Sequence, residues 1–145
     1  MRGYVAARSG PAEALALDPV ATGAVLDEAG FRALLASDRY DELIARCDEL
    51  LNATPEFGMA WVWHGQALVY RDGPEAGRES FQKALELGPE HADFITTEQR
   101  LAAASYHQRH EQFEDVIRLA TELLDEDANS RPARQLRGSA YWYSQ

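Results

Sequence analysis

Apolar residues recur at steps of three and four over most of the chain, and this spacing places them on one face of an α-helix. Residues 40–51, 79–87 and 113–124 each carry such a stripe. In 40–51 the apolar set is Leu43, Ile44, Cys47, Leu50 and Leu51. No stretch shows the sustained alternation of apolar and polar residues that indicates a β-strand. The pattern therefore predicts an all-α fold.

Prolines and turn residues predict where the helices begin. Pro74, Pro89 and Pro132 each stand where a helix can start, because the N–H that proline lacks would have no partner in a first turn. Residues 1–23 are dominated by Gly, Pro and Ala and predict an N-terminal arm, in which 11–17 is the candidate for a short helix. The apolar periodicity and these helix-start signals together predict helices over residues 24–36, 40–52, 57–71, 74–87, 91–109, 112–125 and 131–143.

The chain also repeats itself at an interval of 34 residues (81 − 47 = 34). The matched pairs are Cys47 with Phe81, Leu50 with Ala84, Leu51 with Leu85, and Pro55 with Pro89. A third copy follows at an offset of 39 (116 − 77 = 39), with Gly77, Ala84 and Leu85 matching Val116, Leu123 and Leu124. The five extra residues fall around 91–95, so the helix there is expected to start about one turn early. The repeats then cover about 24–57, 58–91 and 97–130, with a partial copy over 131–145.

These repeats resemble the tetratricopeptide repeat (TPR) family. The second copy carries the family's pattern of large and small residues almost complete, in Trp61, Gly65, Leu68, Gly77, Phe81, Ala84 and Pro89. Other copies depart from it, since Phe31 stands where a small residue is expected and Ala128 replaces the closing proline. The resemblance covers residues 24–145. It implies a right-handed α-α superhelix of about three helix-turn-helix repeats and a C-terminal helix, whose first helices line a concave groove.

The resemblance also implies that the groove binds a protein or peptide. First-helix residues spaced by three or four would face it, and the candidates are Met59, Val62, Trp63, Gln66, Tyr70, Leu101, Ser105, Gln108, Arg109, Gln135 and Trp142. Aromatic anchors ringed by polar groups suit peptide recognition. The alternative is that the aromatic candidates only pack between helices. One branch of the family holds a chaperone's terminal carboxylate with Lys and Asn, but the corresponding positions here are Glu28, Arg32, Met59, Trp63 and Glu98, so that ligand is not predicted.

Charge narrows the range of partners. The formal net charge is −10, from 14 basic and 24 acidic residues, whereas a nucleic-acid binder usually needs a basic face. No apolar run approaches the roughly 20 residues of a membrane helix, and the first residues lack the apolar stretch of a secretory signal. One cysteine, Cys47, permits no intrachain disulfide. We therefore expect a cytoplasmic protein with no nucleic-acid partner and no membrane insertion.

Catalytic chemistry has little support in the sequence. His107 and His110 lie three apart near Glu111 and Glu114, but a structural zinc site typically needs four ligands in a closed shell. Cys47 takes the position of Phe81 in the next copy, which favours a small core residue over a nucleophile. No phosphate-binding glycine loop or nucleophile elbow is present. We expect no enzyme activity, metal or cofactor; a small metal-dependent enzyme using the two histidines is the weakest of the alternatives.

The C-terminal helix suggests a different function. It ends in Ala140, Tyr141, Trp142 and Tyr143, and no further helix is predicted to cover these residues. Exposed aromatic patches promote association. The second hypothesis is therefore a structural segment of a longer repeat protein, or one that self-associates through this helix.

Overall fold

The structure, a computed structural model, describes residues 26–145, and within this range it contains helices and turns but no strand. The all-α prediction is confirmed, whereas the predicted arm over 1–23 and its short helix lie outside the described residues. The helices are α4 (Glu28–Ala36), α5 (Tyr40–Ala53), α6 (Gly58–Asp72), α7 (Arg78–Leu87), α8 (Ala92–Arg109), α9 (Phe113–Glu126) and α10 (Arg131–Tyr143), with 3₁₀ turns η1 (Pro74–Gly77) and η2 (Pro89–His91).

Most helix boundaries agree with the sequence prediction to within one residue. The exceptions are α7, which begins at Arg78 instead of residue 74 because the 3₁₀ turn η1 covers 74–77, and α4, which begins at Glu28 instead of residue 24. Asp27 precedes it in an extended conformation, and its side chain accepts a hydrogen bond from the Gly30 amide at 2.7 Å. This N-cap sets the start of the helix. The early start expected for α8 is confirmed, since it begins at Ala92, 34 residues after the start of α6 at Gly58 (92 − 58 = 34).

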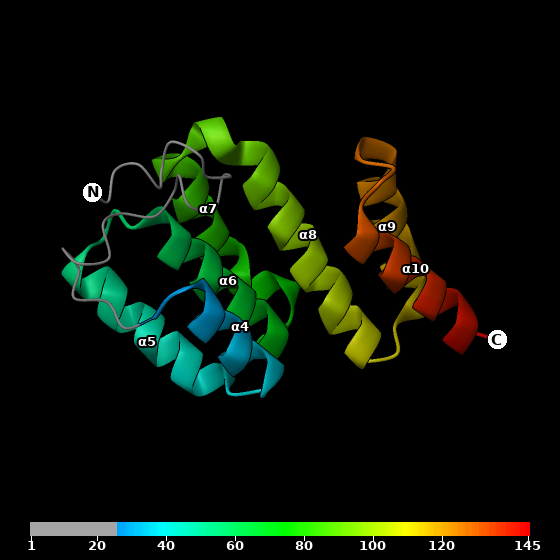
Figure 1. Cartoon of the computed structure of the whole chain (residues 1–145), viewed down its shortest axis with the longest axis horizontal. Coiled ribbons are helices and arrows are strands. Elements are labelled where there is room, and N and C mark those ends of the chain that lie inside the picture. The colour runs from blue at the N-terminus through cyan, green and yellow to red at the C-terminus, as the bar shows by residue number, and fades with distance from the viewer. Residues whose placement is uncertain (1–25) are drawn as a thin grey trace.

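Helices that follow one another in sequence pack as antiparallel neighbours across short turns, as α8, α9 and α10 do in Figure 1. The even-numbered helices also contact one another, α6 beside α8 and α8 beside α10. Phe31 of α4 stacks on Trp63 of α6, with ring centroids 5.7 Å apart. The helices α4, α6, α8 and α10 therefore contact one another in series. In the described part of the chain, no helix is long and apolar enough to cross a membrane.

Two glycines allow a close contact between α6 and η1. A Cβ atom on Gly77 would lie 2.5 Å from the carbonyl oxygen of Gly65 and 2.6 Å from Cγ2 of Val69. A Cβ atom on Gly65 would lie 2.9 Å from the ring of Phe81, which is fully buried. The backbones of α6 and η1 thus touch where both residues lack a side chain, and Phe81 fills the space beside them.

The buried core is not uniform along the chain. One large cluster joins α4 to α8 and includes Phe31, Leu43, Trp63 and Phe81. The contacts among α8, α9 and α10 form two smaller clusters, which consist mainly of alanines with Leu119 and Leu123. Because burial energy grows with apolar area, the C-terminal helices have less to stabilise them.

Native-state hydrogen exchange is expected to show this difference. A fully buried large side chain contributes about 2 kcal/mol, and α9 and α10 share few such residues. We expect their slowest amides to exchange at least about tenfold faster than those of α6. Equal protection of all three helices would contradict a core that thins toward the C-terminus.

Candidate functional site

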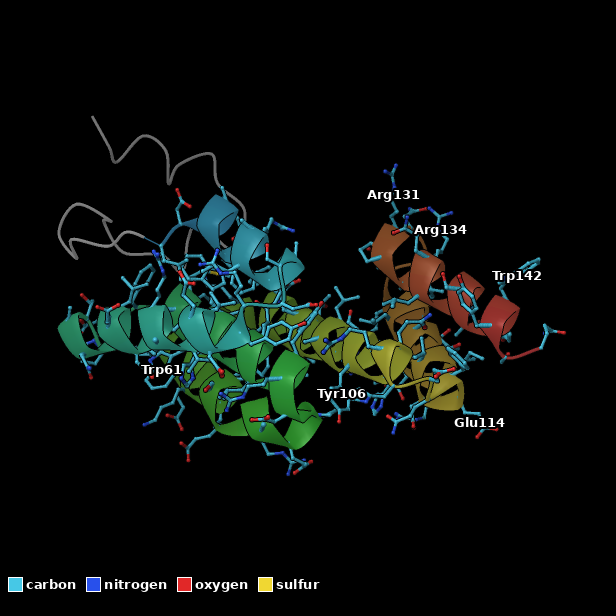
Figure 2. The ribbon with its side chains drawn as sticks, turned by 90° about the horizontal axis from the view of Figure 1, so that it is seen from below. Trp61, Tyr106, Glu114, Arg131, Arg134 and Trp142 are labelled. Atoms are coloured by element: carbon cyan, nitrogen blue, oxygen red, sulfur yellow. The ribbon has the colours of Figure 1, made fainter. Side chains whose placement is uncertain are left out.

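A groove of about 510 Å³ runs along the face formed by α4, α6, α8 and α10. In Figure 2, α4 and the start of α10, marked by Arg131 and Arg134, rise on the same side of the molecule. The side chains that line the groove are Glu28, Phe31, Arg32 and Leu35 from α4; Met59, Trp63, Gln66 and Tyr70 from α6; Phe94, Glu98, Leu101, Ala102, Ser105 and Gln108 from α8; and Pro132, Gln135, Leu136 and Ser139 from α10.

Eight of the eleven candidate residues lie in this lining. They are Met59, Trp63, Gln66, Tyr70, Leu101, Ser105, Gln108 and Gln135. The structure therefore brings together residues from three helices that the sequence pattern placed on equivalent faces. The other three candidates, Val62, Arg109 and Trp142, lie elsewhere.

Val62 is fully buried in the main core and does not line the groove. It sits on α6, which packs against α5, α7 and α8. A helix that is covered on several sides carries apolar residues on more than one face. Spacing by three and four therefore could not separate its groove face from its core face.

Arg109 joins three helices and lies outside the groove lining. Its guanidinium donates hydrogen bonds to the hydroxyl of Tyr40, at 2.7 Å, and to the carbonyl oxygen of Tyr70. It also lies over both tyrosine rings, 5.4 Å and 5.1 Å from their centroids. Burial and the hydrogen bond to Asp38 raise the pKa of Tyr40 to about 12, so its hydroxyl stays protonated. Arg109 is a structural contact of α8 with α5 and α6.

Trp142 projects from the far end of α10, away from the groove lining (Figure 2). It is 75% exposed, and its neighbours Tyr141 and Tyr143 are 51% and 66% exposed. Tyr143 stacks on Phe113 of α9, with centroids 6.4 Å apart. The aromatic end of α10 is thus a separate surface.

Three buried polar atoms on residues that line the groove lack a hydrogen-bond partner. They are Nε1 of Trp63, Oε1 of Gln66 and Oε1 of Gln108, and they are the buried side-chain polar atoms without a partner in the described range. The amide nitrogen of Gln66 donates to Glu98 at 3.0 Å, which leaves its oxygen free. Buried polar groups in native proteins are normally hydrogen-bonded, because leaving one unpaired costs about 1–3 kcal/mol. All three exceptions line one groove.

The charged side chains of the lining are Glu28, Arg32 and Glu98. Glu28 and Arg32 form an exposed ion pair at 2.9 Å. Burial raises the pKa of Glu98, and the nearby charge of Glu28 raises it further, while the hydrogen bond from Gln66 and the charge of Arg32 lower it. The groove therefore holds one carboxylate whose charged form is poorly stabilised.

This shift predicts how the stability of the protein depends on pH. Because the folded pKa of Glu98 is raised above the ordinary 4.5, its contribution is fully present below that value and is lost as pH rises through the folded pKa. Glu98→Gln keeps an acceptor for Gln66 but cannot ionise. We expect the variant to be more stable than the parent at pH 7 and equally stable below pH 4, in urea unfolding followed by circular dichroism. A variant that is less stable at pH 7 would contradict the buried carboxylate.

A second polar cluster has the residue types of a hydrolase triad. His64 Nδ1 lies 2.7 Å from Ser80 Oγ, and His64 Nε2 lies 3.1 Å from Asp48 Oδ1. Ser80 is only 3% exposed, and none of the three residues lines the groove. A substrate carbonyl has no access to a buried hydroxyl, and an acyl-transfer site also needs oxyanion donors beside it. The cluster is a polar link between α5, α6 and α7.

The two histidines considered for a metal make local contacts. His107 Nδ1 lies 2.6 Å from Gln112 Oε1, and the ring of His110 packs at a tilt against Tyr106, with centroids 4.1 Å apart. Among residues 26–145, no three His, Cys, Asp or Glu side chains are grouped so that they could hold a metal ion.

Sequence reasoning missed one wall of the groove and part of its floor. Phe31 and Leu35 of α4 line it, as does Phe94 near the start of α8. Phe31 stands where the TPR pattern expects a small residue, so the pattern does not predict that it lines the groove. Its ring stacks on Trp63. The early start of α8 was a usable signal for Phe94, because it lengthens the face that Glu98 and Leu101 share.

Comparison with protein-family models, with curated proteins and with solved structures finds no match to this chain.

Proposed function

We propose that the chain is a non-catalytic helical-repeat module of the TPR type that holds an extended segment of a protein partner in the groove. The observation that carries the proposal is the collection of three partnerless polar atoms, from Trp63, Gln66 and Gln108, in a groove with aromatic walls. These atoms are buried, so a ligand that supplies donors and acceptors would satisfy them once the three side chains turn toward it.

The spacing of the helices supports a superhelical repeat. The starts of α5 and η1 are 34 residues apart (74 − 40 = 34), as are those of α6 and α8 (92 − 58 = 34). The starts of η1 and α9 are 39 apart (113 − 74 = 39), as are those of α8 and α10 (131 − 92 = 39). Alternate helices contact one another in series, which is how repeat units stack when none can bury its apolar face alone.

The groove has the length of a short peptide. Its residues on α8 run from Phe94 to Gln108 and follow steps of three and four, so they share one face. At about 1.5 Å per helical residue this face is roughly 21 Å long. An extended chain rises about 3.3 Å per residue, so the groove fits roughly six residues of a partner.

An extended backbone offers the hydrogen bonds that the groove lacks. Each of its residues, proline apart, carries one N–H donor and one carbonyl acceptor. The amide oxygens of Gln66 and Gln108 can accept from such donors, and the indole N–H of Trp63 can donate to a carbonyl. The rings of Phe31, Trp63 and Phe94 provide apolar contacts for the segment's side chains.

Selection of random twelve-residue peptides displayed on phage, with the purified chain as bait, tests this proposal. Gln108→Leu removes a partnerless oxygen, so it should leave the free energy of unfolding unchanged or raise it. It should also weaken binding of the selected peptides about fivefold, the value of one hydrogen bond. Gln82→Leu makes the same change on the exposed face of α7 and should leave binding unaltered. Failure to enrich any peptide, or equal affinities for the two variants, would contradict groove binding.

Self-association through α10 is the second candidate, because Tyr141, Trp142 and Tyr143 are all more than half exposed. In this case the chain would be an assembly segment of a longer repeat protein. Sedimentation velocity should then show a concentration-dependent dimer that Trp142→Ser disrupts. A protein that stays monomeric at all concentrations would remove this candidate.

A further inference from the structure

We propose that the partner segment carries a lysine or arginine side chain, which pairs with Glu98 in the groove. The inference rests on the proposed function and names the chemistry that the site selects. The two carboxylates of the lining, Glu28 and Glu98, differ in whether a cation lies beside them.

Glu28 already has a cation, since Arg32 lies 2.9 Å from it. Glu98 has none within ion-pair distance in the described part of the chain; there, its carboxylate accepts from the amide nitrogen of Gln66 at 3.0 Å. A single neutral donor leaves most of the acceptor capacity of a carboxylate unused. Burying a carboxylate is costly unless an opposite charge or several donors accompany it. Glu98 therefore favours a cationic donor.

Gln66 provides the second observation. Its side chain is 8% exposed, and its oxygen Oε1 has no hydrogen-bond partner. This oxygen belongs to the same amide that donates to Glu98, so two acceptors with spare capacity adjoin each other. An ammonium group carries three donors and a guanidinium five, so either has enough donors for both acceptors once the Gln66 oxygen turns toward the groove. A neutral residue with one N–H or O–H cannot.

The surrounding charge agrees with a cationic ligand. The charges that act on Glu98 are Glu28 and Arg32 from α4, and these two neutralise each other. The lining residues of α6 and α10 carry no formal charge near neutral pH, and Arg131 and Arg134 at the start of α10 lie outside the lining. The chain as a whole has a net charge of −10, which attracts basic segments over distance.

Binding of a cation should also depend on pH in a defined direction. Burial raises the pKa of Glu98, and a bound cation stabilises the ionised form, so binding releases protons. Affinity for a basic peptide should therefore rise as pH increases through the raised pKa. Glu98→Gln should flatten this dependence.

The composition of the selected phage peptides tests the inference separately from the proposed function. We expect peptides recovered on the parent chain to be enriched in Lys and Arg at one position. The same selection on Glu98→Gln should lose that enrichment. Glu114→Gln removes the same charge from the exposed start of α9, outside the groove lining, and should keep the enrichment in Lys and Arg (Figure 2).

Selected peptides that lack Lys and Arg, or that are enriched in Asp or Glu, would overturn the inference and leave the groove as a binding site. No enrichment of any peptide would instead contradict the proposed function.

A synthetic copy of one selected peptide gives the quantitative test. Acetylation of its lysine, or its arginine replaced by citrulline, should weaken binding to the parent about tenfold or more, as expected for a charged hydrogen bond. The same change should have little effect on Glu98→Gln, because its partner is already absent. Equal losses on both proteins would place the cation elsewhere and overturn the inference. If sedimentation shows that the parent chain forms a dimer and Glu98→Gln does not, a second copy of the chain occupies the groove. That result would also overturn the inference.

Discussion

Replacing Gly77 with alanine is expected to cost about 3 kcal/mol or more of unfolding free energy, the upper end of what overpacking usually costs. The added Cβ would lie 2.5 Å from the carbonyl oxygen of Gly65 and 2.6 Å from Cγ2 of Val69. A flexible side chain could move aside, but the backbone of α6 could not without separating from η1. Urea unfolding followed by circular dichroism measures the loss.

Gly138→Ala is the matched control. A Cβ at Gly138 meets no atom within 4 Å, and the residue lies inside α10. Alanine is favoured over glycine in a helix by about 1 kcal/mol, so this variant should gain stability. Equal effects from the two substitutions would mean that α6 and η1 do not approach each other as closely as described.

The thiol of Cys47 is expected to react with a disulfide reagent at least about a thousandfold more slowly in the folded protein than in denaturing urea. Burial raises its pKa to about 12, and the charge of Asp48 adds to this shift. At pH 8 about one thiol in 10⁴ would be ionised, against roughly a quarter for a free cysteine, and only the thiolate reacts. Absorbance of the released thiol follows the reaction.

The same shift contributes to the loss of stability at alkaline pH. Because the folded pKa of Cys47 lies above the unfolded one, its contribution is complete below about pH 8.5 and is lost as pH rises toward 12. Cys47→Ala should lose part of this alkaline dependence. Rapid labelling of the native protein at pH 8 would show that α5 does not bury the residue.

Much of the fold could be predicted because its signals are local. Periodicity set the helix type, and Pro74, Pro89 and Pro132 marked the starts of η1, η2 and the first turn of α10. Gly65 and Gly77, two small residues of the repeat pattern, lie where α6 and η1 make their close contact. These features depend on residues near one another in sequence.

The remaining errors concern contacts between distant helices. The spacing of Arg109 predicts a groove residue. Its side chain instead hydrogen-bonds Tyr40 and Tyr70, which lie on two other helices. Val62 shares the spacing of Trp63 and its neighbours, but α6 is covered on several sides. The groove itself was predicted well where one face of α8 lines it, because that face repeats every three or four residues.

The central claim, that the groove binds a partner segment, is tested most directly by the indole N–H signals of the three tryptophans in a nitrogen–proton NMR spectrum. Trp61 donates to the carbonyl oxygen of Pro55 at 2.8 Å outside the groove, Trp63 lines the groove without a partner, and Trp142 is exposed at the end of α10. On addition of a selected peptide, the signal of Trp63 should move to higher proton frequency as its N–H gains an acceptor, while that of Trp61 stays. A spectrum in which Trp63 is unchanged, or in which only Trp142 responds, would contradict the groove as the binding site.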